Sequence, residues 1–153
     1  RSRGIDQTLT VCGDGPDRHA LEKKARQLGM ENTIEFKGWT SPERLAEHYS
    51  HAEVALVPSR YEPFGIVALE AIASGCPVVA SRVDGLPEAV GECGLLVPPE
   101  DPEALADGVE RALESETRTA LRDAMPEHVG RHRIDHIAKE YLEIIEGAVH
   151  AKG

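Results

Sequence analysis

The sequence predicts an α/β fold in which a doubly wound parallel sheet is covered by helices on both faces. Short runs of β-branched and other apolar residues alternate with stretches in which apolar residues recur at helical spacing. The Gly- and Pro-containing turns between them are short, as in chains that pass repeatedly from strand to helix to parallel strand. One run, residues 53–59 (EVALVPS), is almost continuously apolar, which is typical of a strand buried on both faces. The 153 residues are expected to form one domain.

The first strand and helix are predicted at residues 8–13 and 16–29. The strand, TLTVCG, is rich in β-branched residues and ends at a glycine. In the helix that follows, Pro16 suits the first helical position and Gly29 suits the position just after the last turn. A second strand is predicted at residues 32–38, NTIEFKG.

The middle of the chain repeats this alternation. Residues 41–52 predict a helix, because a serine that can cap the first turn is followed by a proline. After the apolar strand at 53–59 come a helix at 65–74 and a strand at 77–81, PVVAS. Each strand should therefore be followed by a helix that crosses back over the sheet.

The last part of the chain changes character. A short helix at 86–90 and a strand at 94–98 complete the alternation. Residues 102–149 show only helical spacing, interrupted near Pro126 and Gly130. We therefore expect a helical cover after the last strand.

The composition narrows the classes of partner. With 27 acidic against 17 basic residues, the formal net charge is −10, and there is no block of Lys or Arg. Such a surface repels phosphate backbones, so we expect no nucleic-acid partner. The three cysteines, Cys12, Cys76 and Cys93, are far apart and fall in or beside apolar runs. This pattern favours buried free thiols in a reducing compartment over a disulfide framework.

No segment of the sequence predicts a membrane span or a secretory leader. No apolar run approaches the roughly 18 residues of a spanning helix, and the first residues, RSRGIDQ, lack an apolar core. We therefore expect a cytoplasmic protein without a transmembrane segment.

Two glutamates bracket a turn that is suited to a nucleotide-sugar. Ligands of doubly wound sheets lie at the carboxyl ends of strands, and the loop PSRYEPFG follows such a strand. The amides of Phe64, Gly65 and Ile66 would be unpaired first-turn donors that attract an anion, most naturally a phosphate. Glu62 precedes this turn and Glu70 lies in the helix, and their carboxylates can accept from adjacent hydroxyls of a sugar or ribose. Either glutamate alone would be explained as well by the helix dipole or by exposure to solvent.

The same stretch resembles a known family. EPFGIVALEAIASGCPVVAS is similar to the signature of retaining glycosyltransferases of the glycogen synthase, sucrose synthase and mannosyltransferase superfamily, the glycosyl transferases group 1, with paired glutamates eight positions apart. The resemblance continues in order through VCGDGP, IEFKGW, AEVALVPS, VDGLPEAV and GECGLLVPPEDPEALADGV. It covers nearly the whole chain.

The resemblance implies a GT-B fold, in which two Rossmann-like domains face each other across a cleft. Residues 1–153 would be the C-terminal, donor-binding domain without its first strand and helix, and the N-terminal acceptor domain would be absent. The implied reaction transfers a sugar from a nucleoside-diphosphate sugar to an acceptor hydroxyl with retention, and it requires no metal or other cofactor. The implied partners are the nucleotide-sugar donor and the acceptor domain, and peripheral membrane association of the full protein stays open.

The resemblance also assigns roles around the paired glutamates. Glu62 would be the catalytic residue that hydrogen-bonds hydroxyls of the donor sugar. Phe64, Gly65 and Ile66 would bind donor phosphate and sugar through main-chain groups, and Glu70 would hold the ribose.

Two further turns resemble parts of the family's donor site. Trp39 and Thr40 follow IEFKG, where the family holds the nucleobase edge with main-chain groups. Gly13 and Gly15 match a glycine turn that borders the same cleft. From the residues themselves, Trp39 is explained equally well by packing, and the glycine turn by a plain connection between strand and helix.

One departure from the family concerns positive charge. The family's domain normally opens with a strand and helix that carry an Arg and a Lys, which neutralise the diphosphate leaving group. Arg1 and Arg3 precede the first predicted strand, at the wrong end for the cleft, and Arg60 and Arg82 do not match the family's positions. The isolated chain is therefore expected to be inactive.

The family's strand order, 3-2-1-4-5-6, implies that the strands at 8–13 and 53–59 flank a missing central strand. An open slot would leave backbone donors and acceptors unpaired in a buried region. We expect either that these two strands pair directly or, preferably, that another segment fills the slot.

Two alternatives to the donor-domain hypothesis concern function. A nucleotide-sugar epimerase shares the two-domain fold, although the spacing of EPFG and the second glutamate is a transferase feature. A non-catalytic nucleotide-binding module would need an acidic cluster at strand ends, which the sequence does not supply.

Three histidines in the C-terminal part, His128, His132 and His136, are spaced by four. This spacing can bind a transition metal when the residues share a helix face. Because Pro126 and Gly130 interrupt the pattern, we interpret the histidines as a solvated polar face and expect no metal site.

Overall fold

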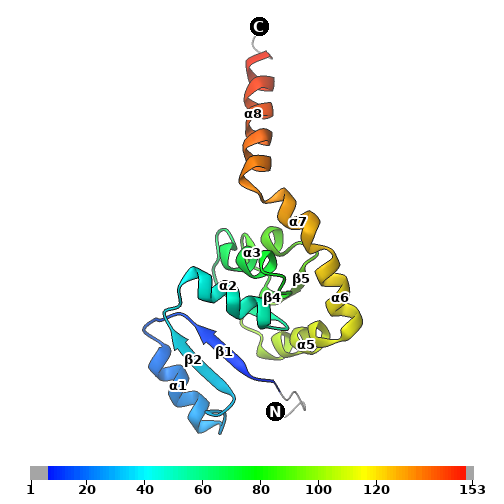
Figure 1. Cartoon of the computed structure of the whole chain (residues 1–153). Coiled ribbons are helices and arrows are strands. Elements are labelled where there is room, and N and C mark those ends of the chain that lie inside the picture. The colour runs from blue at the N-terminus through cyan, green and yellow to red at the C-terminus, as the bar shows by residue number, and fades with distance from the viewer. Residues whose placement is uncertain (1–6, 151–153) are drawn as a thin grey trace. The chain divides into compact units, whose positions relative to one another are not determined.

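The described part of the chain divides after His48 into two units, and each unit is described by itself. The computed structural model describes residues 7–150, apart from the side chains of residue 140 and residues 144–150. Figure 1 gives the order of the elements along the chain. Arg1 and Arg3 lie outside the described residues.

The first unit contains a parallel pair of strands and a helix. Strand β1 (Leu9–Cys12) pairs with β2 (Ile34–Gly38), and α1 (Arg18–Gln27) connects them. The helix ends at a glycine, as predicted. Gly29 has a φ of 63°, and the amide of Met30 donates to the carbonyl of Ala25 at 2.9 Å. These are the features of a Schellman motif, which the left-handed glycine makes possible.

The second unit is built on three parallel strands in the order β3-β4-β5. Their bounds are Ala55–Val57, Val78–Ser81 and Gly94–Val97. All four residues of the central strand β4 are buried. This explains why its sequence has no polar alternation.

Helices cover both faces of this sheet (Figure 1). From β4, Val78 and Ala80 pack into a cluster with α3 (Ile66–Ala73) and α4 (Leu86–Val90). The intervening Val79 packs on the other face in a smaller cluster with α5 (Pro102–Leu113) and α6 (Ser115–Asp123). The predicted doubly wound α/β architecture is therefore confirmed.

The helical C-terminal part breaks near the two predicted positions and at one further residue. Pro126 lies in the first turn of α7 (Met125–Arg131), where the missing amide of proline costs nothing, and Gly130 lies inside the same helix. The breaks lie at Ala124, between α6 and α7, and between α7 and α8 (Ile134–His150), each within a few residues of these two positions; the further break is at Glu114, which has extended backbone angles. The other predicted elements form within a few residues of their expected bounds, including α2 (Pro42–His51).

Of the two expectations for the missing central strand, direct pairing of β1 and β3 is not formed among the described residues, and the filled slot stays a prediction. β1 pairs with β2 and β3 pairs with β4, in two separate sheets, so β1 and β3 do not pair with each other. No described segment pairs with the remaining edge of either strand.

Within residues 7–150, no helix is both long enough and apolar enough to cross a membrane.

The cysteines are free thiols, two of them buried. Cys76 and Cys93 lie in the core of the second unit, whereas Cys12 is half-buried at the end of β1. Burial raises the pKa of the Cys76 thiol from 9.0 to about 11 and also raises the pKa of Cys93. A thiol whose pKa is raised reacts slowly, since the thiolate is the nucleophile.

We expect Cys12 to react with Ellman's reagent in the native protein, and Cys76 and Cys93 to react only after unfolding. The free energy of unfolding should also fall between pH 9.0 and about 11, because the Cys76 thiol then ionises only in the unfolded chain. The loss is roughly 2 to 3 kcal/mol at most. Equal labelling rates for all three thiols in the folded protein would contradict the expected difference in reactivity.

Candidate functional site

In the second unit, hydrogen bonds join the loop that follows strand β3 to the loop that follows strand β4. The amide of Glu62 donates to Oδ2 of Asp84 at 3.1 Å. The amide of Gly85 donates to the carbonyl of Glu62, also at 3.1 Å. Glu62 is therefore held on both sides of its main chain by the loop that follows β4.

The Glu62 side chain is bonded within its own loop. One carboxylate oxygen, Oε1, accepts from the amide of Gly65 at 3.1 Å. Gly65 precedes α3 and has a φ of 71°, in the left-handed region that favours glycine. A Cβ at Gly65 would overlap the Cβ of Ala89, so the start of α3 lies directly against α4. The turn 62–65 is thus fixed by α4 as well as by its own hydrogen bonds.

The first turn of α3 presents unpaired donors. Among the described residues, the amides of Ile66 and Val67 have no acceptor, whereas the prediction of an unpaired Gly65 amide is wrong, because that amide donates to Glu62. The side chains of Ile66 and Val67 are exposed, and so is Phe64, which is 74% accessible. Because helix amides point along the axis at the N-terminus, this end of α3 can bind an anion.

Glu70 lies on the exposed side of α3 while its neighbours point into the core. Ala71 and Ile72 are buried, and Glu70 is exposed four residues after Ile66, on the same face of the helix. This placement explains why the otherwise apolar sequence of α3 contains a carboxylate. The five predicted site residues of this unit therefore lie on one loop and the first two turns of one helix.

Four further predicted site residues lie in the first unit, in the turns after β1 and β2. The amide of Gly13 donates to the carbonyl of Gly38 at 2.7 Å, and the Thr40 hydroxyl donates to the same carbonyl at 3.1 Å. Gly15 lies in the exposed turn that leads into α1. The two turns therefore meet. Trp39 is 77% exposed, so the alternative that it is a packing residue of this unit is not supported.

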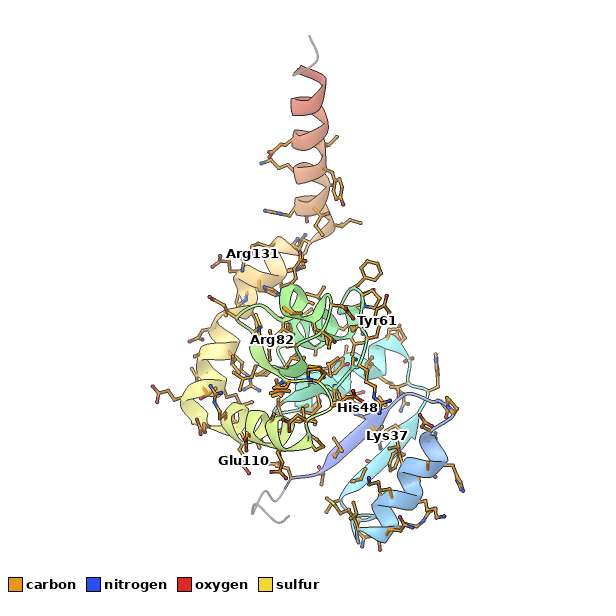
Figure 2. All side chains as sticks on the ribbon, turned by 180° about the vertical axis from the view of Figure 1, so that it is seen from behind. Lys37, His48, Tyr61, Arg82, Glu110 and Arg131 are labelled. Atoms are coloured by element: carbon orange, nitrogen blue, oxygen red, sulfur yellow. The ribbon has the colours of Figure 1, made fainter. Side chains whose placement is uncertain are left out.

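The arginines near the second-unit loops are exposed. Nε of Arg60 pairs with Oε1 of Glu100 at 3.1 Å, and both side chains are largely in solvent. Arg82 follows β4 and is also exposed (Figure 2). Tyr61, which directly precedes Glu62, is exposed as well and is labelled in the same view.

A hollow of about 170 Å³ lies beside the turn 62–65. Its lining comes from the turn itself, from α3 and α4 and from the end of α7: Pro63, Phe64, Leu69, Gly85, Glu88, Ala89 and His132. It places the aromatic ring of Phe64 and one imidazole on the same concave surface.

The histidines do not form the solvated face that was predicted. His128 is buried, at 4% exposure, because α7 packs on the sheet cluster; His132 is half-buried and His136 is exposed. Among the described side chains, no group of three or more His, Cys, Asp or Glu residues could hold a metal ion.

Sequence reasoning did not single out Asp84 and Gly85. Both belong to the motif VDGLPEAV, and Asp84 has a φ of 41°, which is unusual for a residue other than glycine. The Asp-Gly pair was the available signal, since such pairs favour left-handed turns. Its partner could not be read from the sequence, because Glu62 is 22 residues away.

Comparisons with known proteins agree with one another. The glycosyl transferases group 1 family matches residues 1–128. A D-inositol 3-phosphate glycosyltransferase of Corynebacterium urealyticum is 40% identical over 145 residues, which cover 89% of this chain and 34% of that protein. The chain spans about a third of the length of the curated relatives that it matches.

Solved structures show the same architecture. Sucrose-phosphate synthase from Thermosynechococcus elongatus matches with a TM-score of 0.77 and 35% identity over 94% of this chain and 39% of its own. The Anabaena protein HepE, determined in complex with UDP, matches with a TM-score of 0.75 and 25% identity over 92% of this chain and 41% of its own.

Proposed function

The chain belongs to the glycosyl transferases group 1 family, and from this premise we propose that it is the donor-binding part of a retaining glycosyltransferase. The whole protein would transfer a sugar from a nucleoside-diphosphate sugar to an acceptor hydroxyl, in the cytoplasm. Residues beyond this chain would supply the acceptor site, since the chain corresponds to about a third of its curated relatives.

The observation that carries this proposal is the arrangement of the turn 62–65 and α3. Amides at the start of a helix provide positive potential for a diphosphate. Glu62 lies on one side of them, held at its main chain, and Glu70 lies on the other, exposed on the helix. Two acceptor-only carboxylates around an anion site match the hydroxyls that flank the diphosphate of a nucleotide-sugar.

Each residue has a separate role in the proposed mechanism. The amides of Ile66 and Val67 stabilise the charge that develops on the diphosphate as it leaves. Glu62 orients the sugar through its hydroxyls, and Glu70 holds the ribose. Phe64 covers the sugar side. The proposed reaction requires no bound metal.

The relatives support a nucleotide donor without fixing the sugar. The Anabaena relative was determined with UDP bound, which makes UDP and UDP-glucose suitable first probes. In the first unit, we propose Gly13, Gly15, Trp39 and Thr40 as residues that bind the nucleotide.

We expect Glu70→Ala to weaken binding of both UDP and UDP-glucose by about 1 to 3 kcal/mol, the range for losing hydrogen bonds to a charged group. Glu62→Ala should instead weaken UDP-glucose more than UDP, because its role is to grip the sugar. Titration calorimetry with UDP, GDP, ADP and their glucose conjugates measures both. Glu127→Ala, at another exposed glutamate, is the matched control and should leave all affinities unchanged.

Unchanged affinities in both site variants would remove the donor-site assignment. Incubation of the full-length protein with the nucleotide-sugar alone separates transfer from epimerisation, since an epimerase would convert the sugar without an acceptor. The isolated chain should give no turnover in either assay.

A further inference from the structure

We infer that His128 is a positioning residue for the donor site: it fixes the end of α4, and α4 in turn fixes the turn that carries Glu62. This inference rests on the proposed function for its effect on ligand binding. The contacts themselves are a property of the fold.

The imidazole of His128 is buried and makes one specific hydrogen bond. Its Nε2 lies 2.8 Å from the carbonyl oxygen of Ala89, which is 39 residues earlier in the chain. A carbonyl oxygen only accepts, so Nε2 carries the proton and donates. The ring also lies against the main chain of Gly91, where a Cβ would come within 2.8 Å of Nδ1. The ring therefore packs against the last turn of α4 and the glycine that follows it.

The carbonyl of Ala89 is one that α4 cannot satisfy by itself. The helix has only five residues, and the carbonyls of a last turn have no intrahelical donor. Gly91 donates its amide to Pro87 at 3.1 Å. His128, from α7, supplies the donor for Ala89. A carbonyl in the last turn of this short helix is thus satisfied by a side chain from a distant element.

The same residue, Ala89, touches the donor turn. Its Cβ lies 2.4 Å from where a Cβ of Gly65 would be, so the methyl group of Ala89 packs against the main chain of Gly65. Its amide donates to the carbonyl of Gly85 at 3.0 Å, and Gly85 donates to the carbonyl of Glu62 at 3.1 Å. Each step from His128 to Glu62 is therefore a direct contact.

His132 supports the position of His128. The two ring centroids are 4.4 Å apart with the planes tilted by 44°. Nδ1 of His132 lies 2.9 Å from the carbonyl of His128 and donates to it. His132 also lines the hollow that contains Phe64 and Ala89. The end of α7 is thus tied to the same surface as the donor turn.

The test uses two variants of the full chain. His128→Leu fills the buried space but has no hydrogen-bond donor, and His128→Gln has a side-chain amide that can still donate. Leu121→Ala is the control for lost stability, because Leu121 is buried in the other cluster with Val79, Val97 and Ala112. If the leucine variant does not fold, His128→Asn takes its place, since its shorter amide does not reach Ala89.

Two measurements are compared in these variants. Hydrogen exchange by NMR follows the amides of Gly65 and Gly85, both bonded to Glu62. Calorimetry follows the ratio of the dissociation constants for UDP-glucose and UDP. In His128→Leu we expect faster exchange at both amides and a ratio raised about tenfold, the scale of one lost hydrogen bond at the sugar. His128→Gln should restore both values, and Leu121→Ala should change neither beyond its general loss of stability.

Exchange at Gly65 and Gly85 that is the same in His128→Leu and Leu121→Ala overturns the inference. So does an unchanged ratio in a protein whose wild type binds both ligands. If the wild type binds neither nucleotide while the exchange effect is present, the proposed function fails for these ligands and the positioning contact stands.

Discussion

Replacing Gly65 with alanine is expected to lower the free energy of unfolding by about 2 to 5 kcal/mol and to abolish binding of the nucleotide-sugar. Two costs combine at this position. The φ of 71° is left-handed, which a residue with a Cβ adopts only with strain. The new methyl group would also overlap Ala89 and lie 3.4 Å from Leu86 and 3.5 Å from the carbonyl of Gly85. Thermal unfolding and titration with UDP-glucose measure the two effects.

Gly75 provides a matched control at the other end of the same helix. Its φ is 81°, yet a Cβ there would meet nothing within 4 Å. Gly75→Ala should therefore show the backbone cost alone, about 1 kcal/mol, with nucleotide-sugar affinity unchanged. Equal losses of stability in the two variants would mean that contact with α4 does not constrain the start of α3.

Gly85→Ala is expected to separate the two loops at the ends of β3 and β4. Gly85 has a φ of −78°, so alanine fits the backbone without strain. A Cβ would however overlap the carbonyl oxygen of Pro63 and come within 3.0 Å of Cα of Phe64. Because main chain cannot move aside as a flexible side chain does, we expect a loss of roughly 1 to 3 kcal/mol and a shifted turn 62–65.

The readout for Gly85→Ala is twofold. Affinity for UDP-glucose should fall more than affinity for UDP, and the amide resonances of the turn 62–65 should shift. Gly130→Ala is the control, and its expected effect on the free energy of unfolding has the opposite sign. Gly130 lies inside α7 with no neighbouring atom within 4 Å of a Cβ, so alanine should stabilise by up to about 1 kcal/mol. A Gly85 variant with unmoved turn resonances would show that the loops are not in tight contact.

The sequence predicted the elements that burial alone dictates. PVVAS is apolar up to its final serine because β4 is covered on both faces, and such a run has few alternative structures. Glu70 could be assigned to an exposed helix face because its neighbours fix the orientation of α3.

The parts that escaped prediction depend on contacts between distant segments. His128 was interpreted as solvated, since nothing local indicates that α7 brings it against α4, 39 residues away. The loop contact of Glu62 with Asp84 is of the same kind. Direct pairing of β1 and β3, the less preferred of two expectations, is not formed; both expectations were inferred from a family strand order rather than from residues of this chain.

The hydrogen bond between the Glu62 carboxylate and the amide of Gly65 has a consequence for the thermodynamics of recognition. A free glutamate side chain has conformational entropy equivalent to about 1.5 to 2 kcal/mol that is lost when it is immobilised. Here much of that freedom is already lost on folding, because Oε1 is anchored while the remaining lone pairs stay available to hydroxyls. The site is in this respect preorganised, and a donor that meets it has less disorder to remove from the protein. The sugar would then be recognised by a carboxylate whose direction was set before the ligand arrived.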